Sequence, residues 1–154
     1  MTTHAGLPDL FGRATVVMGG HAGLREGMQL LRGYSASFRE EVTDSADSAK
    51  ACLEAFGERV SAHFAAEEGP DYFGTFADES LSLLQGITQL KLEHTELSRL
   101  LAALRDFQDI ELRPVEFSRA LDAFLESFVA HERREHALLQ DFFTAGDSEL
   151  PAQR

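Results

Sequence analysis

The sequence predicts an all-α protein, an up-down-up-down bundle of four helices. Apolar residues recur at steps of three and four along four long segments, which is the spacing of one face of a helix. Polar stretches, a Gly-Pro pair and an isolated proline separate these segments. The chain has 154 residues and is 44% hydrophobic, which suits a buried core, so we expect a single domain over residues 1–154.

The first helix is expected at about residues 8–38. A single histidine interrupts its apolar stripe, which consists of Ala14, Val17, His21, Leu24, Met28 and Leu31. Glycines crowd around this histidine, and each costs a helix interior about 1 kcal/mol relative to alanine; they are Gly19, Gly20, Gly23 and Gly27. They indicate either a close helix crossing or a gap that admits a small ligand beside His21, and both readings stay open.

The second helix is expected at about residues 46–68, with Thr43, Asp44 or Ser45 as its cap. Its stripe ends in a polar pair: Leu53, Phe56, Val60, His63 and Glu67. Gly69-Pro70 should end the helix. We expect the aromatic segment at residues 71–76 to cover the open end of the core.

The third and fourth helices are expected at about residues 79–107 and 114–144. The third has Asp78 or Ser80 as its cap, and one histidine interrupts its stripe: Leu83, Ile87, Leu90, His94, Leu97, Leu101 and Leu104. Pro114 suits the first position of the fourth helix. Its stripe again carries a histidine and a glutamate four residues apart: Phe117, Leu121, Phe124, Phe128, His131, Glu135, Leu138 and Phe142. The polar tail, residues 146–154, is expected to fray.

The polar residues that interrupt the four stripes form a candidate metal site. A bundle buries such stripes, and an unpaired buried carboxylate costs several kcal/mol unless it is neutralised, paired or bound to a metal. Side chains four apart on a helix are neighbours, so both members of each His–Glu pair can reach one cluster. A lone histidine on an apolar stripe is ordinarily a hydrogen-bonded core residue, but here every helix supplies one. The predicted ligands of two metal ions are His21, His63, Glu67, His94, His131 and Glu135.

Other polar residues near these positions are expected to play lesser parts. We expect Glu68, Glu93 and Glu132 to point elsewhere as boundary or surface charges. His136 is turned about 100° from Glu135 and is expected to be solvated. His4 lies in the N-terminal segment, which we expect to be loose. Tyr34 and Tyr72 could line a pocket, but packing in the core is the stronger expectation for both.

Composition excludes several classes of function. The net charge of −12 disfavours nucleic acids and anionic membrane surfaces as partners. Cys52 is the single cysteine, so neither an internal disulfide nor a cysteine metal cluster can form within one chain. The opening residues carry no secretory signal pattern, and no stretch is long and apolar enough to span a membrane. We therefore expect a cytoplasmic location.

The residues from His21 to about Phe143 resemble the hemerythrin-like family, also called the HHE cation-binding domain. The resemblance rests on His21, His94 and two motifs, His63-Phe64-Ala65-Ala66-Glu67 and His131-Glu132-Arg133-Arg134-Glu135. It implies a four-helix bundle that holds two iron ions in an oxo- or hydroxo-bridged di-iron centre. By analogy, His21 and His63 would bind one iron, His94 and His131 the other, and Glu67 and Glu135 would bridge them.

The sequence departs from the oxygen-carrying members of that family. Those have two histidines four apart on the third helix, whereas Leu90 and Ser98 flank His94 here at that spacing. The position five after His131, an aspartate in the carriers, is His136, and the acid is Glu135. Fewer histidines leave open coordination positions. The resemblance therefore implies reaction with oxygen, peroxide or nitric oxide rather than reversible oxygen carriage, with a possible electron donor.

Three alternatives stay open from sequence. The same centre could serve a di-iron oxygenase acting on an organic substrate, which predicts a cavity beside His21 larger than a diatomic ligand needs. An iron- or oxygen-responsive interaction module predicts a large loss of stability on chelation. A plain bundle without metal predicts that His63→Ala and Glu135→Ala leave stability unchanged or higher. If the centre instead binds or reduces a small oxidant, which is the leading hypothesis, the residues expected to line the ligand pocket are Phe128, Leu97, Leu24 and Val60.

Overall fold

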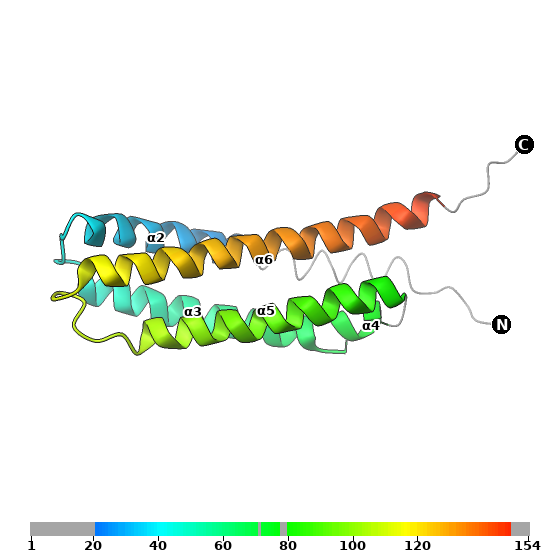
Figure 1. Ribbon diagram of the computed structural model, residues 1–154, viewed down its shortest axis with the longest axis horizontal. Helices are drawn as coiled ribbons and strands as arrows, with labels where there is room; N and C mark the ends of the chain where they lie inside the picture. Colours follow the sequence, from blue (N-terminus) through cyan, green and yellow to red (C-terminus); the bar gives the residue numbers. More distant parts are fainter. Residues whose placement is uncertain (1–20, 71, 78–79, 149–154) are drawn as a thin grey trace, which may run out of the picture.

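The computed structural model describes residues 21–70, 72–77 and 80–148 (Figure 1). Four long helices account for most of this part, and none of its residues lies in a strand. The helices are α2 (His21–Arg39), α3 (Ala46–Glu68), α5 (Leu81–Arg105) and α6 (Pro114–Ser148), with the short α4 (Phe73–Ala77) between α3 and α5. His4, Ala14, Val17, Gly19, Gly20 and Asp78 lie outside the described residues.

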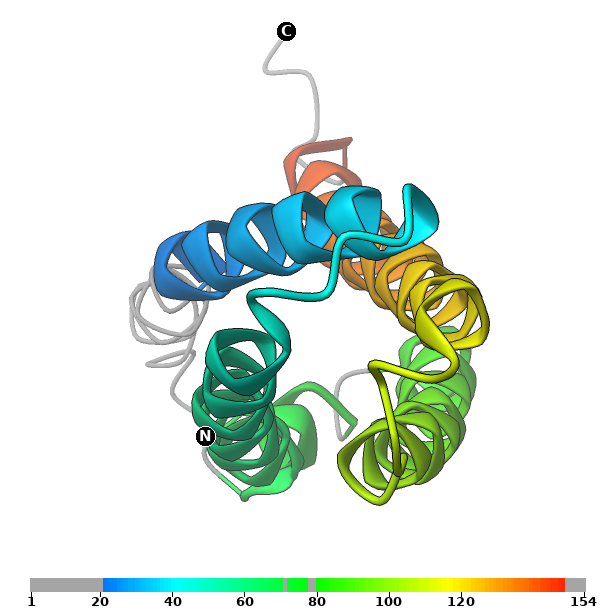
Figure 2. The ribbon, with the colours of Figure 1, turned by 90° about the vertical axis from the view of Figure 1, so that its left-hand side faces the viewer.

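The predicted all-α four-helix bundle is confirmed. Each long helix packs against two neighbours, in the cyclic order α2, α3, α5, α6. Viewed along the bundle, the four helices surround a common core (Figure 2). Consecutive long helices run in opposite directions, so the topology is up-down-up-down (Figure 1). No described helix combines the length and the apolar character that crossing a membrane requires.

The helix ends follow local signals. The Ser80 side chain accepts a hydrogen bond from the Leu83 backbone N–H at 3.0 Å, which caps α5. Ser45 occupies the same position before α3 but makes no such side-chain bond. Gly69 is extended and ends α3. α6 begins at Pro114 and reaches Ser148, four residues beyond the expected end, because Phe142 packs against the core near its last turns.

The segment between α3 and α5 brings His63 on α3 and His94 on α5 to the same height along the bundle axis. α5 has thirteen residues before His94, whereas α3 has five after His63, a difference of about 12 Å along a helix axis. α4 occupies this extra length and packs mainly on α5. Its buried side chains, Phe73 and Phe76, cover the end of the core as the sequence predicted for this aromatic segment.

The apolar core consists of two clusters on either side of the predicted metal ligands. The larger cluster, toward the α2–α3 and α5–α6 connections, includes Leu24, Phe56, Val60, Phe64, Leu97, Phe124 and Phe128. The smaller one, beneath α4, comprises Tyr72, Phe73, Phe76, Leu83, Ile87, Leu90 and Leu139. Burying the polar side chains of the predicted ligands between two apolar clusters costs folding free energy unless hydrogen bonds or a bound cation compensate them.

Gly27 lies at a close crossing of α2 and α3, one of the two explanations offered for the glycines of the first helix. A Cβ atom at Gly27 would lie 2.7 Å from the Phe56 ring, so α2 and α3 cross too closely there for any side chain. At Gly23 a Cβ would meet the Arg59 guanidinium at 3.7 Å, an ordinary contact. The described glycines of α2 therefore allow a close helix crossing and do not open a gap beside His21.

Candidate metal centre

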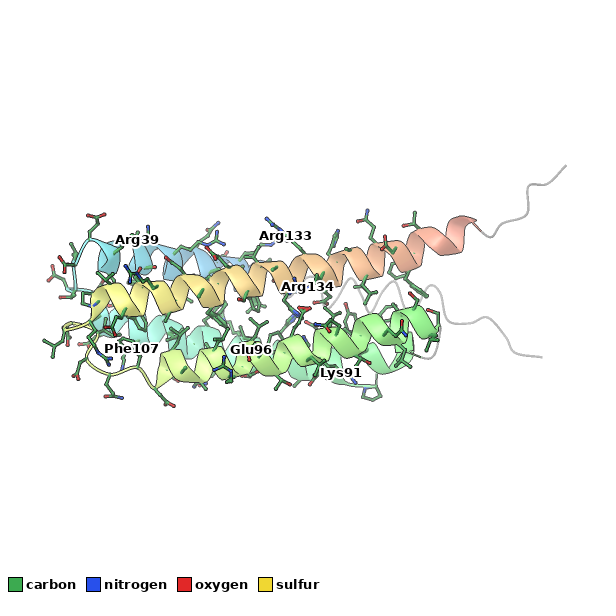
Figure 3. The ribbon with its side chains drawn as sticks, viewed as in Figure 1. Arg39, Lys91, Glu96, Phe107, Arg133 and Arg134 are labelled. Carbon is green, nitrogen blue, oxygen red and sulfur yellow. The ribbon has the colours of Figure 1, made fainter. Side chains whose placement is uncertain are left out.

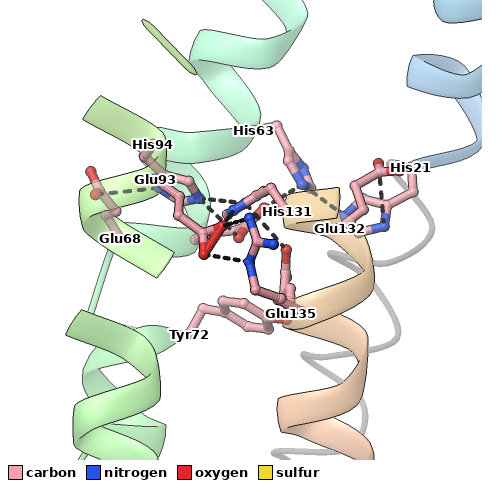
Figure 4. Close-up of polar contacts among 11 residues, drawn as sticks. His21, His63, Glu68, Tyr72, Glu93, His94, His131, Glu132 and Glu135 are labelled. Carbon is pink, nitrogen blue, oxygen red and sulfur yellow. Dashed lines mark hydrogen bonds and ion pairs between the residues drawn. The ribbon is translucent and has the colours of Figure 1, made fainter. Parts of the chain in front are cut away.

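All six predicted ligand side chains converge in the middle of the bundle (Figure 4). Five are nearly inaccessible to solvent, with relative exposures of 0% for Glu67, 1% for Glu135 and for His131, 3% for His94 and 7% for His21. His63 is half-buried. Every long helix contributes, as the four interrupted stripes predicted.

The four histidines meet in two pairs through their Nε2 atoms. His21 Nε2 lies 2.8 Å from His63 Nε2, and His94 Nε2 lies 3.1 Å from His131 Nε2. Nitrogen atoms at this separation can bind a single ion together. These are the same pairs that the family resemblance implies would each share one iron.

Glu67 lies between the two pairs. Its Oε1 is in close contact with His63 Nε2, and its Oε2 lies 3.6 Å from His94 Nε2. The ligand atoms form two groups, one with His21, His63, Glu67 and Glu135, the other with Glu67, His94 and His131. Glu67 belongs to both, so this carboxylate is placed to bridge two ions.

Glu135 is placed differently. Its Oε1 accepts a hydrogen bond from the Tyr72 hydroxyl at 3.0 Å, and its Oε2 lies 3.9 Å from His131 Nε2. Tyr72 is 1% exposed and comes from the segment just before α4. Tyr72 does pack in the core, as the sequence favoured over a place in the pocket, but its hydrogen bond to a predicted ligand was not foreseen.

Several buried oxygens of the centre lack a hydrogen-bond partner among the described residues. They are both oxygens of Glu67 and Oε2 of Glu135. Leaving such atoms unsatisfied costs about 1 to 3 kcal/mol each, and more for a charged group. A cation held between them would satisfy all three, so the residues present fit a metal centre.

The outer nitrogens of three histidines face a second set of carboxylates. His131 Nδ1 hydrogen-bonds Glu93 Oε2 at 3.0 Å. His94 Nδ1 lies 3.3 Å from Glu68 Oε1, and His21 Nδ1 lies 3.9 Å from Glu132 Oε1. The expectation that these glutamates point elsewhere was therefore wrong. The side chain of each glutamate extends to a histidine of the neighbouring helix. The spacing of residues along one helix cannot predict such a contact.

Such partners fix the orientation and tautomer of a metal-binding imidazole, because a carboxylate at Nδ1 leaves Nε2 free for the ion. Glu93 is itself held by the Arg134 guanidinium, with Nε 2.6 Å from Oε1 and Nη2 2.8 Å from Oε2. Arg134 projects between α6 and α5 (Figure 3). The arginine also outweighs the effect of burial and keeps the pKa of Glu93 below its ordinary value.

The environment keeps two of the imidazoles, His21 and His131, neutral, as metal binding requires. Burial, reinforced by the neighbouring His63, lowers the pKa of His21 to about 4. Burial also lowers the pKa of His131, although the hydrogen bond to Glu93 opposes the shift. Both histidines therefore offer a lone pair at neutral pH.

The two central carboxylates titrate in opposite directions without a metal. Burial and the negative charge of Glu67 raise the pKa of Glu135. Burial acts the same way on Glu67, but the close contacts with the imidazoles of His63 and His94 outweigh it and lower that pKa. Two close carboxylates cannot both ionise cheaply in a dry core, so one keeps a proton until a cation replaces it.

Aromatic rings hold the inner histidines in place. The Phe64 ring stacks on His94, with centroids 3.9 Å apart and an interplanar angle of 11°. Its edge also packs against His131 at 5.6 Å. Phe73 lies on His94 as well, at 5.8 Å. These contacts exclude water from the His94–His131 pair.

The space beside the centre is not where it was expected. Phe128, Leu97, Leu24 and Val60 are buried in the larger core cluster rather than lining a pocket. A pocket of about 560 Å³ instead lies between α2 and α6, with His21 and Glu132 in its wall. His136 is exposed and lines the same pocket. Tyr34 packs against the core cluster, away from the centre.

Comparison with known proteins places this geometry in a family. The model of the hemerythrin HHE cation-binding domain matches residues 14–143. The chain belongs to the hemerythrin HHE family. The match spans all six predicted ligands, and membership implies that the His and Glu clusters bind a metal cation. Neither the curated proteins nor the solved structures contain a match to this chain.

Proposed function

We propose that this HHE-family chain holds two iron ions and binds or reacts with a small oxidant, namely oxygen, peroxide or nitric oxide. The observation that carries the proposal is the position of Glu67 between two pairs of imidazoles, His21 with His63 and His94 with His131. A single ion would leave one pair and one carboxylate oxygen buried without a partner.

The donor set favours iron. Imidazole nitrogen and carboxylate oxygen, with no thiolate in either group, suit iron among the biological transition metals. Iron would supply the one-electron redox chemistry that small oxidants require. Each group supplies two histidines with one or two carboxylates, which are fewer donors than six-coordinate iron accepts, so positions remain for a small ligand.

The chain's own residues contribute binding, orientation and exclusion of water. Glu93 orients His131 by a hydrogen bond from outside, and Glu68 and Glu132 place negative charge beside His94 and His21. Tyr72 holds one oxygen of Glu135, which directs the other toward His131. The aromatic rings around His94 keep bulk water away, which strengthens electrostatic interactions at the centre.

The first test is metal stoichiometry with a matched pair of variants. The protein is loaded anaerobically with Fe(II), and bound iron is measured per chain for wild type, His94→Ala and His136→Ala. We expect two ions in wild type and in His136→Ala, because His136 is exposed and outside the ligand set. We expect His94→Ala to lose about one ion.

The second test asks about the oxidant. Loaded protein is mixed with oxygen, peroxide or nitric oxide, and its visible and Mössbauer spectra are followed. We expect charge-transfer bands and coupled iron pairs to develop within the mixing time of at least one oxidant. Iron-free wild type, equal iron content in the two variants, or spectra unchanged by all three oxidants would overturn the proposal.

One observation favours a second candidate, an oxygenase acting on an organic molecule. The pocket of about 560 Å³ beside His21 is far larger than a diatomic ligand needs. Its position on the outer side of His21 would place an organic molecule next to one half of the centre. Oxidant consumption that depends on an added organic compound would distinguish this candidate from the first.

A further inference from the structure

The pocket between α2 and α6 has an unusual wall. Residues of α2 form one side and residues of α6 the other, and the lining comprises His21, Arg25, Met28, Gln29, Arg32, Val129, Glu132, Arg133, His136, Ala137 and Gln140. Each side follows steps of three and four, so the wall consists of two facing helix stripes. A volume of about 560 Å³ is within the range of pockets that bind small organic molecules.

The wall is positively charged in a strongly acidic protein. Of the described residues that line it, three are arginines, Arg25, Arg32 and Arg133, and one is a carboxylate, Glu132. The chain as a whole carries a net charge of −12. A local excess of positive charge on such a surface attracts anions to this place in preference to the rest of the protein.

The pocket arginines are also free to bind a ligand. Five other arginines form ion pairs with carboxylates, and none of the five lines the pocket: Arg39, Arg99, Arg105, Arg113 and Arg134. By contrast, no hydrogen bond or close ion pair joins Arg25, Arg32 or Arg133 to another residue of the described ranges, although the charge of Arg25 favours the ionised form of the nearby Glu132. Arg133 stands on the outer side of α6, opposite in direction to Arg134 (Figure 3).

The pocket reaches the metal centre through one imidazole. His21 lies in the pocket wall, while its Nε2 is 2.8 Å from His63 Nε2 inside the centre. Arg25 follows His21 by one helical turn, and Glu132 approaches His21 Nδ1 at 3.9 Å. A molecule held in the pocket would thus contact the outer side of a predicted metal ligand.

We propose that this pocket is a binding site for a small organic anion, whose carboxylate or phosphate group is bound by Arg25 and Arg133 near His21, while Arg32 adds positive charge further along α2. The arginine fork matches the planar oxygens of either acid group and binds them with two parallel hydrogen bonds. Val129, Met28 and Ala137 supply apolar contact for the organic part. The site is independent of which metal the centre holds, so it does not depend on the proposed function.

Binding is measured on the full-length chain, metal-free and iron-loaded, by ¹H–¹⁵N NMR titration that includes the arginine Nε–H signals. The probes are benzoate, its neutral analogue benzamide, and inorganic phosphate. We expect benzoate to shift the signals of pocket residues saturably in both metal states, and benzamide to leave them unchanged. Saturation by phosphate as well would show that the acid group alone is recognised.

The variants are Arg25→Gln and Arg133→Gln, with Arg119→Gln as the matched control, an exposed arginine of α6 outside the pocket. Each pocket substitution is expected to weaken benzoate binding about tenfold, the usual effect of losing a charged hydrogen bond. The control should bind as wild type does, and all three variants should retain their iron.

Three results would each overturn the anion site. They are equal binding of benzamide and benzoate, an equal loss in the Arg119→Gln control, and the absence of saturable shifts with every anion. None of them bears on iron binding. Conversely, iron-free protein that still binds benzoate would refute the proposed function and leave the anion site standing.

Discussion

Substituting Glu93 by glutamine tests whether the outer carboxylates act on the metal centre. Glu93 Oε2 accepts a hydrogen bond from His131 Nδ1–H at 3.0 Å. Glu93→Gln keeps the size of the side chain and an oxygen that can accept the same bond. It removes the negative charge that makes the imidazole a stronger donor and that pairs with Arg134.

The expected loss is about tenfold in metal affinity. Removing an outer partner of a metal-bound histidine typically costs 10- to 100-fold, and about 1.4 kcal/mol corresponds to each factor of ten. Glutamine should lie at the lower end of that range because it preserves the hydrogen bond. Glu93→Ala removes both bond and charge, so its loss should approach 100-fold.

The assay is a competition titration of Co(II) or Fe(II) against a chelator of known affinity, under nitrogen. Glu96→Gln is the control, because Glu96 lies on the same helix, pairs with Arg99 in a similar fork, and is fully solvent-facing. The reasoning would be refuted by equal affinities in Glu93→Gln and Glu96→Gln. It would equally fail if Glu93→Gln lost affinity only through unfolding, which circular dichroism of the metal-free variant detects.

Four further outcomes are expected. Chelating the metal should lower the thermal midpoint, since bound ion at 100 times its Kd adds about 2.7 kcal/mol to the unfolding free energy. In metal-free protein the raised pKa of Glu135 means that the folded state holds a proton that the unfolded state lacks, so stability measured by urea should fall from about pH 7 to 8.5, and Glu135→Gln should abolish that slope. Gly27→Ala should destabilise by about 1 to 3 kcal/mol, because its Cβ would lie 2.7 Å from Phe56. Gly33→Ala, with no atom nearby, should stabilise by up to about 1 kcal/mol in the same urea titration.

The sequence predicted the bundle because helical periodicity is a property of one segment at a time. Among the described residues, the apolar members of the four stripes are buried, except that Leu138 and Phe142 are partly buried. The histidines and glutamates that interrupt the stripes are as deeply buried, except for the half-buried His63. Spacing of four along α3 and α6 puts His63 with Glu67, and His131 with Glu135, on one face. Neither inference needed the arrangement of one helix against another.

The parts that were missed depend on helix-to-helix register. Glu68, Glu93 and Glu132 each adjoin a predicted ligand, so a single helix turns them about 100° away from it. That direction is the boundary with the next helix of the bundle, where the facing histidine lies. Tyr72 was missed for a similar reason, because a short helix between α3 and α5 determines where its hydroxyl ends.

The outer carboxylates link the four helices in sequence. α3 supplies Glu68 to His94 on α5, α5 supplies Glu93 to His131 on α6, and α6 supplies Glu132 to His21 on α2. A shift of α5 or α6 by a single turn, about 5.4 Å, would separate two of these contacts, and the same shift of α2 or α3 would separate one. Because the same helices also carry the ligands, the register that satisfies the carboxylates is the register that closes the metal centre. Metal binding and correct packing of the bundle should therefore stabilise each other, since each lowers the free energy of the same arrangement.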